Sequence, residues 1–166
     1  MNVLTCAACG SRLTEPLRLL PEVPPRPEHE GLKNPDGSRH APPTLPRGTY
    51  AVDPEPCGAP YVPHPDPEWC GSAHPGDVCM GDPDGPGCLM SAGPRDTWVV
   101  HPEDARGRLS ANPAVEEIGC CGRPGREGPN EVCAECGTAV ATLFSECYGP
   151  YETHFLPDAV RVEAVV

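Results

Sequence analysis

Cysteine is the residue type whose number and spacing in this chain point most directly to chemistry. The 166 residues include 11 cysteines. Two pairs share one spacing, and each pair is followed by glycine: Cys6-x-x-Cys9-Gly10 and Cys133-x-x-Cys136-Gly137. Two sulfurs at the tip of a hairpin can bind one ion, and zinc favours four tetrahedral ligands. The two pairs together therefore predict a four-cysteine zinc site of the zinc-ribbon type.

A second grouping of cysteines competes for the same role near the C-terminal end. Its members are Cys120, Cys121, Cys133, Cys136 and Cys147. A local four-cysteine site that uses one of the adjacent pair would leave Cys6 and Cys9 to bind elsewhere. We expect the adjacent Cys120 and Cys121 to belong to different sites, or one of them to be structural only. All seven cysteines are therefore candidate ligands of one or two structural Zn²⁺ ions, and the partition stays open. With two ions, the missing ligand would come from His154, an acidic residue or a central cysteine.

The C-terminal motif also carries a resemblance. Its parts in chain order are Gly119-Cys120-Cys121-Gly122, Gly128-Pro129-Asn130, Cys133-x-x-Cys136-Gly137 and Glu146-Cys147. With the N-terminal Cys-x-x-Cys-Gly, this run resembles a group of uncharacterised actinobacterial proteins of zinc-ribbon character. The resemblance covers roughly residues 1–20 and 95–160. It implies zinc binding and supplies no activity.

Four more cysteines lie in the central segment and fall outside that pattern: Cys57, Cys70, Cys79 and Cys88. They contain no Cys-x-x-Cys pair, although His64 and His74 lie between them. One interpretation is a third metal site. The alternative, which the spacing favours, is a set of reduced and partly exposed loop thiols, so these four are not counted as ligands.

The overall composition explains why the chain would need metal. It has 25 prolines, 18 glycines and a formal net charge of -12. A chain of this kind struggles to bury enough apolar surface to fold. A structural zinc ion contributes apparent free energies of about 10–16 kcal/mol in small zinc peptides. Because whole domains are stable by only about 5–15 kcal/mol, one ion can decide whether the chain folds.

The elements that position the cysteines are expected to be short. The sequence predicts a small β-rich α+β protein: a metal-stapled core of the zinc-ribbon type with a long irregular insertion rich in proline and glycine. We expect a single domain, divided into an N-terminal zinc knuckle (1–15), the insertion (16–94) and a C-terminal zinc-binding part (95–166).

Local patterns place the regular structure within that plan. β-Branched and aromatic residues predict strands at 49–52, 97–100, 140–144 and 152–156. Asn112-Pro113 offers a helix cap followed by proline at the first helical position, which predicts a short helix over 114–118. Proline elsewhere in the insertion opposes helices and central strands.

The sequence also offers an enzymatic alternative, a zinc-dependent deaminase-like hydrolase. His101-Pro102-Glu103, followed by Cys133 and Cys136, resembles the zinc-deaminase pattern, in which His and two Cys bind zinc and Glu shuttles protons. Val132 replaces the proline expected before the first cysteine, and Gly137 breaks the helix that these cysteines should begin. In the simpler interpretation, His101 is a loop residue at a strand end and Glu103 is a solvated charge.

Charge and processing signals narrow the function further. The acidic balance disfavours nucleic acid, because phosphate binding draws on clustered Lys and Arg. We find neither a secretory signal nor an apolar run that would cross a membrane, and reduced cysteines suit the cytoplasm. The sequence therefore favours a cytoplasmic structural-zinc module, a binding or adaptor protein with an acidic surface and an unknown protein partner, over an enzyme.

Overall fold

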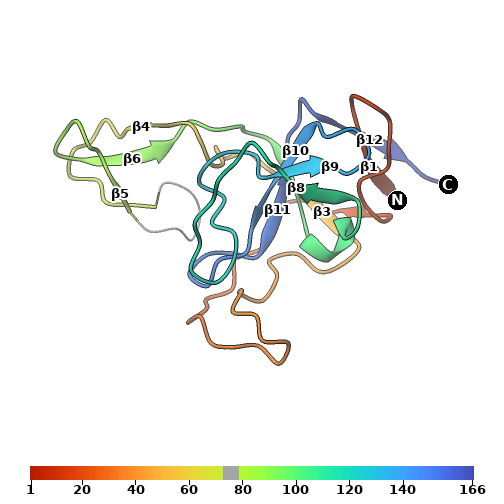
Figure 1. Ribbon diagram of the computed structural model, residues 1–166, viewed down its shortest axis with the longest axis horizontal. Coiled ribbons are helices and arrows are strands. Elements are labelled where there is room, and N and C mark those ends of the chain that lie inside the picture. Colours follow the sequence, from red (N-terminus) through yellow and green to blue (C-terminus); the bar gives the residue numbers. More distant parts are fainter. Residues whose placement is uncertain (73–78) are drawn as a thin grey trace.

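The computed structural model describes residues 1–72 and 79–166, and these residues form an almost purely β protein (Figure 1). The strands are β1 (Asn2–Cys6), β2 (Arg18–Leu19), β3 (Thr49–Asp53), β4 (Tyr61–Pro63), β5 (Met80–Gly81), β6 (Cys88–Ser91), β7 (Thr97–Val100), β8 (Leu109–Ala111), β9 (Glu131–Cys133), β10 (Ala139–Phe144), β11 (Glu152–Phe155) and β12 (Val160–Ala164). Within the described residues, the single helical element is the 3-10 turn η1 (Pro102–Ala105).

The central sheet has seven strands in the order β2-β3-β7-β11-β10-β9-β8. Its β2 and β3 are parallel, and the other neighbours are antiparallel. The core gathers on this sheet, where Val100, Val140 and Phe155 pack in one buried cluster with Leu4 and Val160. The last two residues come from β1 and β12, so the second sheet covers the central one.

That second sheet joins the two ends of the chain. Strands β1 and β12 pair antiparallel from Asn2 opposite Ala164 to Cys6 opposite Val160. Both labelled ends therefore lie on the same side of the molecule (Figure 1). The pairing carries Cys6 to the edge of the buried core.

The third sheet, β4-β6-β5, forms a lobe at the opposite end of the molecule (Figure 1). Its strands bury little: Cys88 and Ser91 in β6 are buried, whereas the residues of β4 and β5 are exposed or half-buried. The lobe therefore has almost no apolar core of its own.

Two features of the predicted fold class are wrong. The α+β prediction fails because residues 112–119 form a turn and irregular backbone in place of a helix. Glu117 of this stretch accepts bonds from Arg123, Asn130 and the Gly125 N–H, which fixes the backbone in a loop, and Ile118 is 98% exposed. With Ile118 exposed, this stretch buries too little apolar surface to stabilise a short helix.

The insertion is also less irregular than predicted. Residues 16–94 contribute β2 and β3 to the central sheet and form the whole of the β4-β6-β5 lobe. The predicted strand at 49–52 corresponds to β3, which pairs with β7 and buries Tyr50 and Ala51. Pairing of β3 with the buried strand β7 outweighs the prolines of the insertion, most of which lie between the strands, although Pro63 ends β4.

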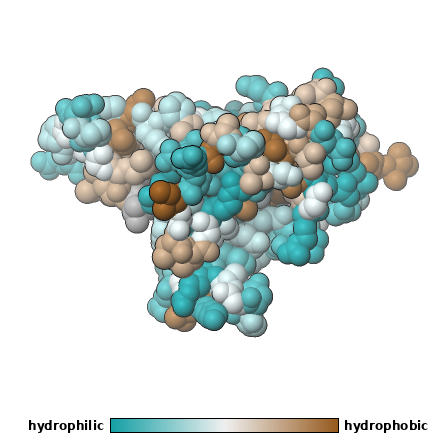
Figure 2. Space-filling view, viewed as in Figure 1, coloured by the Kyte–Doolittle hydropathy of each residue, from teal (hydrophilic) through white to brown (hydrophobic). Residues whose placement is uncertain are grey.

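The surface is mixed in polarity. On the face drawn in Figure 2, hydrophilic side chains cover all parts of the molecule, and hydrophobic ones lie between them in small groups. Within the described residues, no helix has the length and apolar character needed to cross a membrane.

Candidate metal centres

The N-terminal Cys-x-x-Cys turn follows directly from strand β1. Cys6 is the last residue of the strand, and its N–H donates to Ser11 O at 2.8 Å. The Gly10 N–H donates back to Cys6 O at 2.8 Å. Gly10 has φ 76°, a left-handed conformation that side chains disfavour, which explains the glycine.

The C-terminal turn repeats this geometry. Cys133 ends β9, its N–H donates to Thr138 O at 2.8 Å, and the Gly137 N–H donates to Cys133 O at 2.8 Å. Gly137 has φ 75°. The two turns are thus the same local structure, each presenting two sulfurs on one side.

The two turns face each other and bring four sulfurs together. The Sγ atoms of Cys6 and Cys136 are 3.7 Å apart, and those of Cys9 and Cys133 are 3.8 Å apart. All four sulfurs lie within 4.8 Å of one another. Tetrahedral coordination with Zn–S bonds of about 2.3 Å requires sulfurs roughly 3.7–3.8 Å apart. This group, called the terminal site below, could hold a metal ion.

The terminal site mixes buried and exposed thiols. Cys6 and Cys133 are buried, whereas Cys9 and Cys136 are exposed. Hydrogen bonds from the Thr138 side chain and backbone lower the pKa of Cys136 to about 6, and the Ser11 side chain and backbone lower the pKa of Cys9 in the same way. Burial raises the pKa of Cys133 to about 11. In the C-terminal turn, the exposed Cys136 is therefore more readily deprotonated than the buried Cys133.

A second group, called the loop site below, consists of Cys120, Cys121 and Cys147 with Glu146. Their ligand atoms also lie within 4.8 Å of one another. The adjacent Cys120 and Cys121 have Sγ atoms 3.4 Å apart and are both exposed, and Cys147 is partly exposed. The structure thus brings both members of the adjacent pair to one group, where the sequence suggested different sites.

Glu146 organises the backbone of the loop site. Its buried carboxylate accepts the N–H groups of Cys120 at 2.8 Å, Cys121 at 2.7 Å and Cys147 at 3.0 Å. The flanking glycines are needed for close backbone approach. A Cβ at Gly119 would overlap Gly122 O, and one at Gly122 would overlap Ser145 O.

The Gly128-Pro129-Asn130 run holds the loop that carries Cys120 and Cys121 in place. Asn130 is fully buried; its Oδ1 accepts the Leu143 N–H at 2.7 Å, and its Nδ2 donates to Leu143 O at 2.9 Å and to Glu117 at 3.0 Å. Arg123 pairs with both Glu117 and Glu131 at 3.0 Å. Asn130 and Arg123 therefore fix the loop to β10, a role that spacing alone did not reveal.

The third group, called the lobe site below, contains three of the four central cysteines, for which the sequence left a third metal site open but favoured loop thiols. The Cys70 sulfur lies 3.8 Å from those of Cys79 and Cys88, and the last two are 2.8 Å apart. Cys79 immediately precedes β5 and Cys88 begins β6, so the hairpin in which Gly81 pairs with Cys88 brings the two side by side. The Gly, Pro and Asp residues between them were the available sign of a hairpin. His74, considered with these cysteines, lies outside the described residues.

Cys57 and His154 belong to a different environment. His154, considered above as a missing metal ligand, is buried, with Nε2 2.6 Å from Glu152 Oε2 and Nδ1 2.9 Å from Thr97 Oγ1. The thiol of Cys57, itself buried, lies beside the imidazole. Glu152 also accepts bonds from Arg26 and Thr44. The structure therefore places His154 in an internal polar network, away from the three cysteine groups.

His101 and Glu103 also lie apart from the cysteine groups. His101 caps η1, where its Nδ1 accepts the Glu103 N–H at 3.0 Å. The Glu103 carboxylate pairs with Arg106 at 2.6 Å. The groups that the described residues form around Cys133 and Cys136 do not include His101.

Comparison with protein-family models, curated proteins and solved structures found no match to this chain.

Proposed function

We propose that this chain is a zinc-binding protein in which a structural zinc ion at the terminal site joins the two ends of the chain. The loop site would bind a second zinc ion. The observation that carries the proposal is the set of four sulfurs at the separations expected for tetrahedral zinc, formed by cysteine pairs 124 and 130 residues apart in the sequence.

The donor set supports zinc over the oxygen-binding ions. Four thiolates in a tetrahedral arrangement suit zinc or iron, whereas calcium and magnesium select oxygen ligands. All 11 cysteines are free thiols in the structure, so disulfides do not compete for them. The backbone N–H groups of both turns point toward the sulfurs and would stabilise their negative charge.

The surface charge supports a binding or adaptor role. The chain carries a formal net charge of -12, and each four-thiolate zinc site adds two further negative charges. Such a molecule would associate with a basic protein surface more readily than with nucleic acid. The resemblance to actinobacterial zinc-ribbon-like proteins belongs to the same proposal.

The deaminase-like hydrolase is the second candidate, and the geometry supports it less well. It requires zinc on His101, Cys133 and Cys136, with an open position for water and Glu103 as the proton carrier. The two cysteines instead lie with Cys6 and Cys9, and a zinc ion with four thiolates has no open position.

Zinc per chain, measured by atomic absorption on the purified protein and three variants, separates these candidates. We expect Cys6→Ser to lose one ion and His101→Ala to lose none. Ala8→Ser, an exposed change in the same turn, is the matched control and should keep the full count. Loss of an ion in His101→Ala with retention in Cys6→Ser would support the hydrolase, and a metal-free native chain would overturn both.

A further inference from the structure

The loop site has a hollow in front of its sulfurs. The hollow is lined by Cys120, Cys121, Cys147, His29, Arg39 and Tyr148. The terminal site, in contrast, has two of its four sulfurs buried against the core. Solvent therefore reaches the loop site from one open side.

Glu146 cannot easily complete this site as a fourth ligand. Glu146 is 2% exposed, and both of its carboxylate oxygens accept backbone N–H groups from the three cysteines. Turning the carboxylate toward a metal would break these partly buried hydrogen bonds and leave their N–H groups without this acceptor. Glu146 is thus a positioning residue for the three sulfurs.

His29 lies in the same hollow without joining the group. Its Nε2 is 2.8 Å from Arg39 O, and its ring is absent from the set of ligand atoms within 4.8 Å of the sulfurs. Two residues later the backbone touches Cys147, where a Cβ on Gly31 would lie 3.2 Å from Cys147 O. The segment therefore forms one wall of the hollow beside the thiols.

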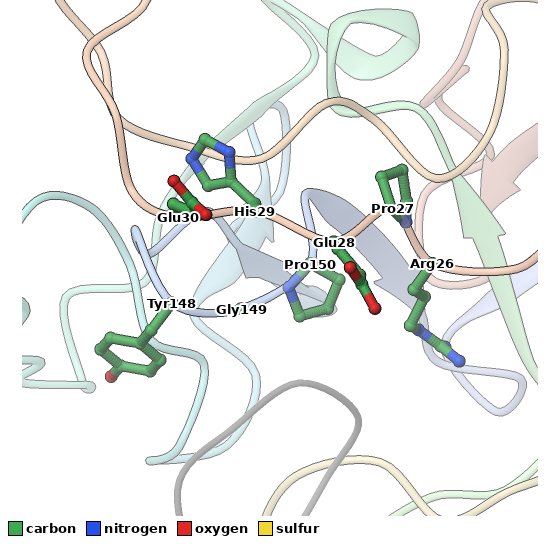
Figure 3. A pocket seen from close by; sticks show the side chains of 8 residues that line it. All are labelled: Arg26, Pro27, Glu28, His29, Glu30, Tyr148, Gly149 and Pro150. Atoms are coloured by element: carbon green, nitrogen blue, oxygen red, sulfur yellow. The ribbon is translucent and has the colours of Figure 1, made fainter.

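The hollow continues into a neighbouring one that shares the His29, Glu30 and Tyr148 walls. Figure 3 shows residues 26–30 along one side of this second hollow and residues 148–150 along the other. A ligand longer than a single sulfur-bearing group has room to extend along this path.

We propose that Cys120, Cys121 and Cys147 bind a zinc ion whose fourth coordination position opens into this hollow and accepts a small thiol from solution. This rests on the zinc binding proposed above. Zinc with three protein ligands keeps a water molecule at its fourth position. On exchange, the zinc–water bond breaks and a zinc–sulfur bond forms; the thiol loses its proton to solvent and the water is released.

The chemistry of the site favours a thiol over harder ligands. Three thiolates make the zinc soft, and a fourth sulfur completes the all-sulfur set that suits it. The guanidinium of Arg39 lines the hollow and would offset the negative charge that a fourth thiolate adds. A thiol that also carries a carboxylate would gain from the same charge.

The test uses the full chain loaded with Co²⁺, whose visible absorption reports the ligands and geometry of each ion, titrated with 2-mercaptoethanol. We expect a saturable spectral change from one cobalt ion per chain. Cys147→Ser and Cys121→Ser should each lose this change, whereas Ala8→Ser and the lobe variant Cys79→Ser should keep it.

Three results would overturn the inference: no spectral change in the wild-type chain, the same change in both loop-site variants, or a change that appears only after His29→Ala, which would make His29 the fourth ligand. Metal content measured on the same samples separates this failure from failure of the proposed function. If Cys6→Ser still loses one cobalt ion while the thiol has no effect, only the open position is disproved.

Discussion

The terminal site and the loop site use the same residue type with opposite relations to the fold. The terminal site joins cysteines that lie 124 and 130 residues apart in the sequence. Two of its four cysteines, Cys6 and Cys133, belong to the buried core. The loop-site cysteines lie within residues 120–147, are largely exposed, and take their positions from the Glu146 carboxylate. A metal ion at the terminal site would hold distant parts of the fold together. The loop site, in contrast, takes its geometry from hydrogen bonds that form without a metal ion.

Metal removal should give the largest difference between the two sites. We expect a strong chelator to abolish cooperative unfolding and to expose the β1 and β12 amides, because structural zinc contributes about 10–16 kcal/mol in small zinc peptides. Thermal melting and hydrogen exchange of residues 2–6 and 160–164 measure this effect. Cys121→Ser, which alters only the loop site, should still melt cooperatively. An unchanged melting temperature after complete metal removal would contradict the comparison.

The second prediction concerns pH and the internal network on β11, which lies next to the loop site in sequence. Burial opposes the charge of Glu152, but His154 and Arg26 outweigh it and lower its pKa from 4.5 to about 2. Burial likewise opposes the charge of His154, but Cys57 and Glu152 raise its pKa from 6.5 to about 10. The stability from Glu152 is complete above pH 4.5 and is lost toward pH 2. The stability from His154 is complete below pH 6.5 and is lost toward pH 10.

The stability that Glu152 and His154 contribute should therefore be greatest between pH 4.5 and 6.5 and fall on either side, by on the order of 3 kcal/mol on the acid side. The alkaline side gives the cleaner test, because thiolates bind zinc more tightly as pH rises while the His154 contribution weakens. Denaturant unfolding of the zinc-saturated chain at several pH values measures it. As pH rises, amide hydrogen exchange should increase around Arg26, which pairs with Glu152, before it increases in β1. Faster exchange in β1 first would reverse this order.

The third prediction removes the support of the loop site without touching a sulfur. Glu146→Gln puts an amide donor against backbone N–H donors, which costs about 1–3 kcal/mol and should release one metal ion. Glu135→Gln is the matched control, since Glu135 is exposed on the C-terminal turn of the terminal site and should keep every ion. Metal content and melting temperature report both variants. Equal behaviour of the two would remove the special role of Glu146.

The two Cys-x-x-Cys turns could be predicted from the sequence because a few neighbouring residues determine their conformation. A Cys-x-x-Cys-Gly spacing defines a tight turn wherever it occurs, and two copies indicate a shared site; the structure places those four sulfurs together. Their role as ligands stays a prediction. The lobe site depends instead on the register of the β5–β6 hairpin, which no local spacing encodes.

Other features were beyond the sequence because they depend on tertiary contacts. The stretch at 114–118 has a good helix cap, yet Glu117 is drawn into bonds with Arg123 and Asn130 that require a loop. Glu146 and Asn130 read as ordinary polar residues until their burial is known. Charge and composition alone do not tell a positioning carboxylate from a solvated one.

The pairing of β1 with β12 has a consequence for the order of folding. The ribosome makes Cys6 and Cys9 124 to 130 residues before it makes their partners in the C-terminal turn. Closing so long a loop is entropically costly and slow. We therefore expect the nascent chain to carry an incomplete set of sulfurs while these residues are synthesised, which makes the availability of reduced thiols and free zinc at that stage a determinant of yield.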